Sequence, residues 1–61
     1  MNQKLVNEKQ AAEYLGLSRS TLQSLRFMHK PPAYVKIGRS VRYLVEDLDE
    51  FLKSRRINPE K

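Results

Sequence analysis

The sequence contains no cysteine and only one histidine. Without cysteine the chain forms neither disulfides nor thiolate metal sites, and His29 alone cannot build a zinc site. No apolar run approaches the roughly 20 residues of a transmembrane helix, and no signal-peptide core follows Met1. These absences predict a cytoplasmic protein with no metal, no cofactor and no membrane partner.

The chain is also short, at 61 residues and 7.2 kDa, which is enough for one small domain. A domain of this size buries only about 60% of the surface of its unfolded chain, so its stability is expected to be marginal. We expect residues 1–57 to form this domain and residues 58–61 to be a frayed tail.

Acidic side chains are absent from residues 14–45, although the whole chain has seven of them. The same region carries six basic residues, whereas residues 1–13 are neutral overall and residues 46–61 are slightly acidic. A surface that only has to be soluble usually mixes both signs of charge. The concentrated positive charge therefore predicts a polyanionic partner. The six basic residues are Arg19, Arg26, Lys30, Lys36, Arg39 and Arg42.

Two short helices are predicted on either side of a tight turn. Asn7 is a good N-cap for a helix over about residues 8–15, and Gln10 is placed to complete a capping box. Gly16 favours the left-handed conformation that ends many helices. Ser18 can cap a second helix immediately afterwards. This succession is typical of a helix-turn-helix.

The second helix is expected to run from about Arg19 to Phe27 or Met28. Leu22 and Leu25 share the face that points towards the core. We expect Phe27 and Met28 to close over the hairpin that follows, and the alternative is that they form an exposed surface for a partner. The outward half of the helix then carries Arg19, Ser20, Gln23 and Ser24.

A β-hairpin is predicted after Pro31 and Pro32, which end any helix. Two β-favouring runs, residues 34–37 and 41–44, flank the three-residue loop at residues 38–40. Symmetric pairing about this loop puts Lys36 and Arg42 on one face, Arg39 at the tip, and four apolar side chains on the other face. In that arrangement Ile37 faces Val41, and Val35 faces Tyr43.

The last helix is expected over about residues 45–56, with an apolar stripe of Leu48, Phe51 and Leu52. Acidic residues crowd its first turns and basic residues its last turns, where both complement the helix dipole. This role explains the acidic residues without a metal site, because consecutive positions on one helix point in different directions. The sequence also lacks the motifs of nucleophilic, phosphate-binding and zinc-protease sites, so we expect no catalytic residues.

Several features together predict binding to nucleic acid. A helix after a tight turn, with short and cationic side chains outward, suits the major groove of DNA. Serine hydroxyls and the helix N-terminus can meet phosphate, and a basic hairpin can follow the backbone or enter a minor groove. Tyr34 and Tyr43 are expected to pack in the core or at its edge rather than to stack on bases. The nine candidate DNA-binding residues are Ser18, Arg19, Ser20, Gln23, Ser24, Arg26, Lys36, Arg39 and Arg42.

Three stretches carry a family resemblance: residues 7–22 (NEKQAAEYLGLSRSTL), 32–43 (PAYVKIGRSVRY) and 46–52 (EDLDEFL). Through them, residues 5–56 resemble the excisionase-like, MerR-type winged helix-turn-helix DNA-binding domains, which include the AlpA-like prophage regulators. The resemblance implies that the helix after Ser18 enters the major groove and that the hairpin is a wing. By position, the residues that match the family's groove-facing set and wing tip are Arg19, Ser20, Gln23, Ser24 and Arg39.

The sequence therefore predicts an α+β fold, a small winged helix-turn-helix with a two-stranded wing and a C-terminal helix. The predicted function is sequence-specific binding of double-stranded DNA. The resemblance implies the role of an excisionase or a small transcriptional regulator of a prophage or mobile element in bacteria. Its further partners would be an integrase or neighbouring copies of itself, with no small-molecule substrate. Two other classes stay open: an antitoxin-like or adaptor module that docks an acidic protein, and an RNA-binding protein.

Overall fold

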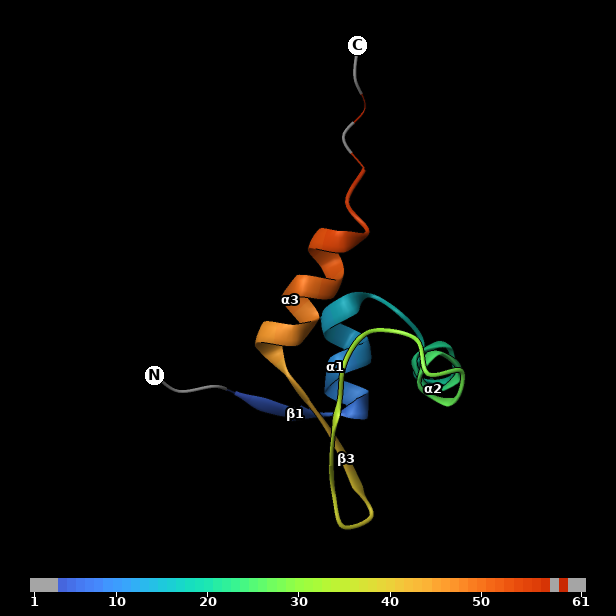
Figure 1. The fold of residues 1–61 in the computed structure, drawn as a ribbon, viewed down its shortest axis with the longest axis vertical. Coiled ribbons are helices and arrows are strands. Elements are labelled where there is room, and N and C mark those ends of the chain that lie inside the picture. The colour runs from blue at the N-terminus through green and yellow to red at the C-terminus, as the bar shows by residue number, and fades with distance from the viewer. Residues whose placement is uncertain (1–3, 58, 60–61) are drawn as a thin grey trace.

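The computed structural model describes residues 4–57 and Pro59. The predicted α+β architecture is confirmed, with a helix-turn-helix, a hairpin wing and a C-terminal helix (Figure 1). The expected frayed tail at residues 58–61 lies outside the described residues, apart from Pro59. The elements in chain order are β1 (Leu5–Asn7), α1 (Glu8–Leu15), α2 (Arg19–Phe27), β2 (Val35–Ile37), β3 (Ser40–Leu44) and α3 (Val45–Ser54).

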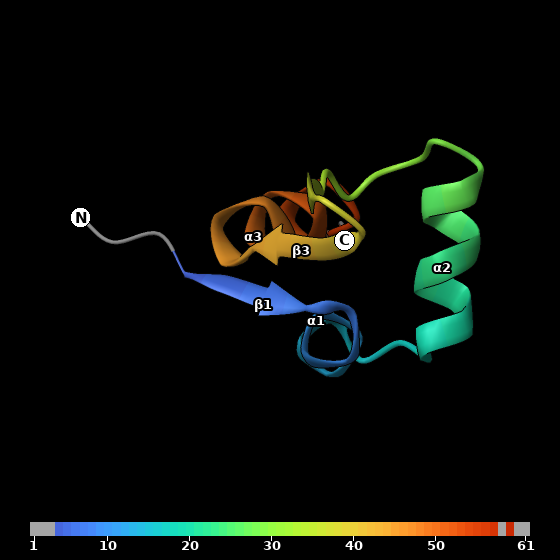
Figure 2. The same ribbon diagram turned by 90° about the horizontal axis from the view of Figure 1, so that it is seen from below.

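The hairpin and α3 extend in opposite directions from the middle of the molecule (Figure 1). Helix α1 lies between them, beside β1. Helix α2 stands at one side, and the connection that follows it leads back from its C-terminal end to the hairpin (Figure 2). The wing comprises β2, β3 and their turn. Its turn lies at the end of the hairpin away from α3, which follows β3 directly (Figure 1).

A third strand, β1, joins the sheet in addition to the two predicted strands. It pairs antiparallel with β3, so the strand order is β1-β3-β2, and Val6 lies opposite Tyr43. The backbone N–H of Val45 donates to the carbonyl of Lys4 at 3.0 Å, which ties the start of α3 to the same N-terminal segment. A strand of three residues is too short for an alternating pattern to reveal it in the sequence.

The turn of the wing is tighter than expected. Two residues, Gly38 and Arg39, join β2 to β3, and Ile37 pairs with Ser40 across them. Gly38 has a positive φ of 60°, and glycine at the first turn position suits a two-residue turn that matches the twist of the strands. The predicted three-residue loop, with Ile37 facing Val41, is therefore wrong.

This shorter turn shifts the whole register of the hairpin. Lys36 pairs with Val41, and Val35 pairs with Arg42 rather than with Tyr43. Directly paired residues project from the same face of a sheet. Lys36 and Arg42 therefore point to opposite faces, and the prediction that they share one is wrong.

The core is small and draws on all three helices and on β3. Tyr43 is fully buried, and Tyr34 is 38% exposed with its ring centroid 6.2 Å from that of Tyr43. The expected packing of these two tyrosines in the core and at its edge is confirmed. Val6, Leu15 and Val41 pack against the buried cluster. The buried residues that form the hydrophobic core cluster are Ala11, Ala12, Leu22, Tyr43 and Leu48.

Helix α3 begins without a side-chain cap and ends at Ser54, two residues earlier than expected. Its N-cap residue is Leu44, which makes no side-chain capping hydrogen bond, and the N–H of Val45 in the first turn is bonded to the carbonyl of Lys4. The hydroxyl of Tyr14 on α1 donates to the carboxylate of Asp49, and this hydrogen bond raises the pKa of Tyr14. That contact holds α3 against α1.

Helices α1 and α2 end in the same backbone motif. After α1, the N–H groups of Gly16 and Leu17 donate to the carbonyls of Glu13 and Ala12. After α2, His29 and Lys30 repeat this pattern, with the N–H of His29 bonded to Arg26 and that of Lys30 to Leu25. This Schellman motif places one residue in the left-handed region. Glycine fills the position after α1 with φ 72°, whereas His29 fills it after α2 with φ 58°.

We predict opposite effects of substitution at these two positions. Gly16→Ala should lower the free energy of unfolding by about 1 kcal/mol, because a Cβ disfavours the left-handed conformation. His29→Gly should raise it, since the strain of a non-glycine residue is removed. Urea denaturation of both variants measures this, and a loss of stability in His29→Gly would contradict the prediction.

Candidate nucleic-acid interface

The start of α2 is exposed and capped. The hydroxyl of Ser18 accepts a hydrogen bond from the N–H of Thr21 at 3.1 Å, which confirms its predicted capping role. The same hydroxyl donates to the side chain of Thr21 at 2.8 Å. Arg19 and Ser20 are exposed on the first turn. An oxyanion would find here a helix N-terminus, a cation and a hydroxyl within one turn.

The outward face of α2 carries one row of side chains. Ser20, Ser24 and Phe27 follow one another at spacings of four and three residues, which places them along one line of the helix. All three are exposed, and Phe27 is 70% exposed. Leu22 on the opposite face is fully buried, as predicted. The expected closure of Phe27 over the hairpin is wrong, and so is that of Met28, which is 54% exposed.

Gln23 and Arg26 point into the domain, towards the carboxylate of Glu8 at the start of α1. The side-chain amide of Gln23 donates to Glu8 Oε1 at 3.2 Å. Arg26 donates through Nε to Oε2 at 3.0 Å and through Nη2 to Oε1 at 3.3 Å. The hydroxyl of Tyr43 donates to Oε2 at 3.0 Å. We call these four residues the Glu8 cluster.

The Glu8 cluster corrects the expected orientation of Gln23 and also holds Arg26, another candidate DNA-binding residue. Gln23 does not lie free on the outward half of α2, and the side chain of Arg26 is only 17% exposed. The guanidinium of Arg26 also lies over the rings of Phe27 and Tyr34, with its central carbon 5.0 and 5.8 Å from their centroids. Both polar side chains therefore hold α2 against α1 and β3.

The pKa values in the cluster are shifted in the directions that preserve it. Burial on its own would raise the pKa of Glu8, but hydrogen bonds from Arg26, Gln23 and Tyr43 outweigh it and lower the pKa overall. Burial and the bond to Glu8 raise the pKa of Tyr43 to about 12, so its hydroxyl keeps its proton and donates. The bond to Glu8 likewise raises the pKa of Arg26.

We predict that this ionised carboxylate contributes stability that is lost in acid. Because the folded-state pKa of Glu8 lies below the ordinary value of 4.5, its contribution is complete above that value and is lost as the pH falls through the folded-state pKa. At pH 7, Glu8→Gln should lower the free energy of unfolding by about 2 kcal/mol. The difference in free energy of unfolding between wild type and Glu8→Gln should shrink as the pH falls from about 5 to about 3, the range in which carboxyl groups titrate.

Urea denaturation across this pH range measures the effect. Glu13→Gln is the matched control, because Glu13 is an exposed carboxylate on the same helix. A constant difference between wild type and Glu8→Gln down to pH 3 would contradict the prediction.

The wing presents its cations in three directions. Arg39 is exposed in the turn, and Lys36 is exposed on the face that it shares with Val41. Arg42 is half-buried on the other face, and its Nη1 donates to the carbonyl of Val41 at 3.0 Å. The three wing cations therefore lie apart from one another and do not form a single charged face.

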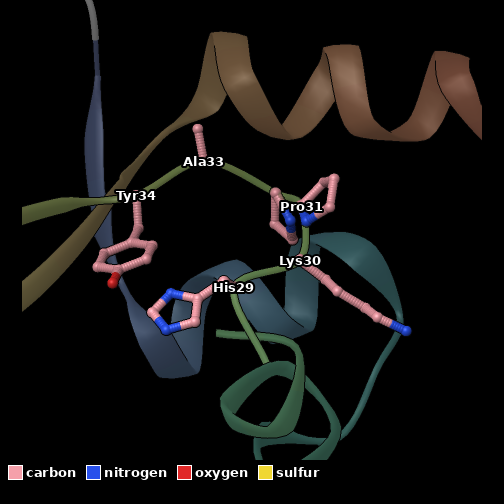
Figure 3. Close-up of a pocket in the computed structure, with 6 residues that line it drawn as sticks. His29, Lys30, Pro31, Ala33 and Tyr34 are labelled. Atoms are coloured by element: carbon pink, nitrogen blue, oxygen red, sulfur yellow. The ribbon is translucent and has the colours of Figure 1, made fainter. Parts of the chain in front are cut away.

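A shallow hollow lies in the connection between α2 and β2, lined by residues 29–34. Figure 3 shows the rings of His29 and Tyr34 near one another at one side of it, with Lys30 extending away. No group of three or more His, Cys, Asp or Glu side chains able to hold a metal ion occurs among the described residues. Within the same part of the chain, no helix is long and apolar enough to cross a membrane.

An exposed, capped second helix beside a cationic wing defines a winged helix-turn-helix domain. A protein-family model described as "Helix-turn-helix domain" matches residues 5–56. The chain belongs to this family, which is that of the excisionase-like and AlpA-like domains. No curated protein matches the chain. Membership indicates binding to double-stranded DNA, and the family is typically non-enzymatic.

Proposed function

We propose that this protein binds double-stranded DNA in a sequence-specific manner, as an excisionase or small transcriptional regulator of a prophage or mobile element in the bacterial cytoplasm. The observation that carries the proposal is the coincidence of charge and fold. The turn, α2 and the wing all lie within residues 14–45, where the sequence has six basic residues and no acidic one. These are the elements with which a winged helix-turn-helix approaches DNA.

The proposed contacts follow from the exposed groups. The row on α2 and Arg19 would lie in the major groove, while the N-terminus capped by Ser18 faces phosphate. The wing cations would follow the backbone or an adjacent minor groove. Gln23 and Arg26 are assigned to positioning α2 instead, because the Glu8 cluster holds them. The proposed DNA-contacting residues are Ser18, Arg19, Ser20, Ser24, Lys36, Arg39 and Arg42.

A domain of this size would act by occupying or bending its site, or by placing a partner beside it. An excisionase would do so next to an integrase or neighbouring copies of itself, and a regulator would occupy a promoter. An excision assay with the integrase encoded nearest to the gene, run in parallel with a promoter-reporter assay, separates the two roles. Stimulated excision supports the first, and repression or activation without excision supports the second.

We predict steep salt dependence for binding to duplex DNA. Four of the proposed contacts are cationic, namely Arg19, Lys36, Arg39 and Arg42. Displacement of about four counterions gives a log–log slope near −3.6, so affinity should fall on the order of a hundredfold between 50 and 200 mM salt. Fluorescence anisotropy with a random duplex measures the slope. A value shallower than about −2 would reject this surface as the contact, and an equal affinity for RNA of the same length would favour the RNA-binding class.

Arg39→Ala should weaken binding to selected and random duplexes by similar factors. A guanidinium at the tip of the wing meets phosphate or a minor groove that distinguishes bases poorly, so its loss should also reduce the salt slope by about one. Lys53→Ala is the matched control, because Lys53 is an exposed cation on α3, which extends away from the wing (Figure 1). Weaker binding to the selected duplex alone would show instead that Arg39 reads bases.

A further inference from the structure

Phe27 is a large apolar side chain that α2 leaves in solvent. It is 70% exposed, more than any other aromatic residue among those the structure describes. The neighbouring guanidinium of Arg26 lies 5.0 Å from its ring centroid and is itself held by both oxygens of Glu8. The ring therefore rests on a fixed cation and not on the core.

The position of Phe27 on the helix places it in the proposed interface. It continues the row of Ser20 and Ser24, and it lies seven residues after Ser20, which is about 10 Å along the helix axis. Gln23 and Arg26 are held by the Glu8 cluster, and the longest side chain in the row itself is the phenyl ring of Phe27. No acidic residue occurs anywhere in residues 14–45 to repel a phosphate backbone from this row.

The major groove of DNA offers one apolar feature, the 5-methyl group of thymine, and phenylalanine is a side chain that contacts it. Resting on the proposed function, we infer that Phe27 is a specificity-determining residue that selects a thymine through this methyl group.

The test removes the methyl group without changing base pairing. A site is first selected from randomised duplexes with the full chain, and each thymine is then replaced singly by deoxyuridine. Wild type should bind one substituted duplex about fourfold more weakly, which is the effect of burying one methyl group. Phe27→Ala should bind the thymine and deoxyuridine duplexes equally, with an unchanged melting temperature because the ring lies outside the core.

Met28→Ala is the matched control for a lost apolar side chain. Met28 is 54% exposed, but it projects about 100° around the helix from Phe27. This variant should keep the fourfold discrimination between thymine and deoxyuridine.

The outcomes separate this inference from the proposed function. Steep salt-dependent binding by wild type, with indifference to deoxyuridine at every position, would overturn the inference and leave the function standing. Discrimination that persists in Phe27→Ala would also overturn it and move thymine recognition elsewhere. Unchanged DNA affinity and preference in Phe27→Ala would likewise overturn it, because the ring would then make no contact with DNA. Absence of DNA binding by wild type would refute the proposed function itself.

Discussion

The carboxylate of Glu8 is the interaction on which the arrangement of this domain depends. It stands at the first residue of α1 and accepts hydrogen bonds from two side chains of α2 and one of β3. A core with few buried side chains leaves much of the orientation of α2 to such polar contacts. An ion pair that is mostly withdrawn from water stabilises a fold only when the remaining hydrogen-bonding groups of both partners are satisfied. For the Glu8–Arg26 pair, Gln23 and Tyr43 donate the further hydrogen bonds to the carboxylate.

This dependence divides the polar residues of α2 between two tasks. Gln23 and Arg26 have the side chains best suited to pair with adenine and guanine edges, yet both are committed to the fold. The side that we propose to face the groove is left with hydroxyls, a phenyl ring and the arginine at the helix start. On that proposal, discrimination would depend on shape and apolar contact more than on paired hydrogen bonds, while the wing would supply charge.

Much of the fold could be predicted because its local signals are strong. The side chains of Asn7 and Ser18 cap the helices that follow them, and Gly16 ends α1 as expected. The wing register could not be predicted, because one residue of turn length decides it and Gly38 is compatible with either loop. The DNA contacts themselves stay predictions, since they concern a partner that the sequence does not contain.

The Glu8 cluster could not be predicted from the sequence, because its members are far apart along the chain. A helix wheel assigned Gln23 to the outward half, although it lies near the border where a long side chain can turn inward. The one available signal is Tyr43, whose β-strand position predicts burial and whose hydroxyl then needs an acceptor. The position of Glu8 in the first turn of α1 predicts only an acidic residue that complements the helix dipole. Nothing in the neighbouring sequence indicates that it also accepts hydrogen bonds from Gln23, Arg26 and Tyr43.

The pairing of β1 with β3 has a consequence for synthesis of the chain on the ribosome. The first strand, Leu5–Asn7, finds its partner only when residues up to Leu44 have been made. The hydrogen bonds within α1 and α2 join residues close in sequence, but Val6 must wait for Tyr43. The nascent chain therefore holds β1 unpaired until β3 has been made, and the three-stranded sheet cannot form before β3 can lie between its two neighbours.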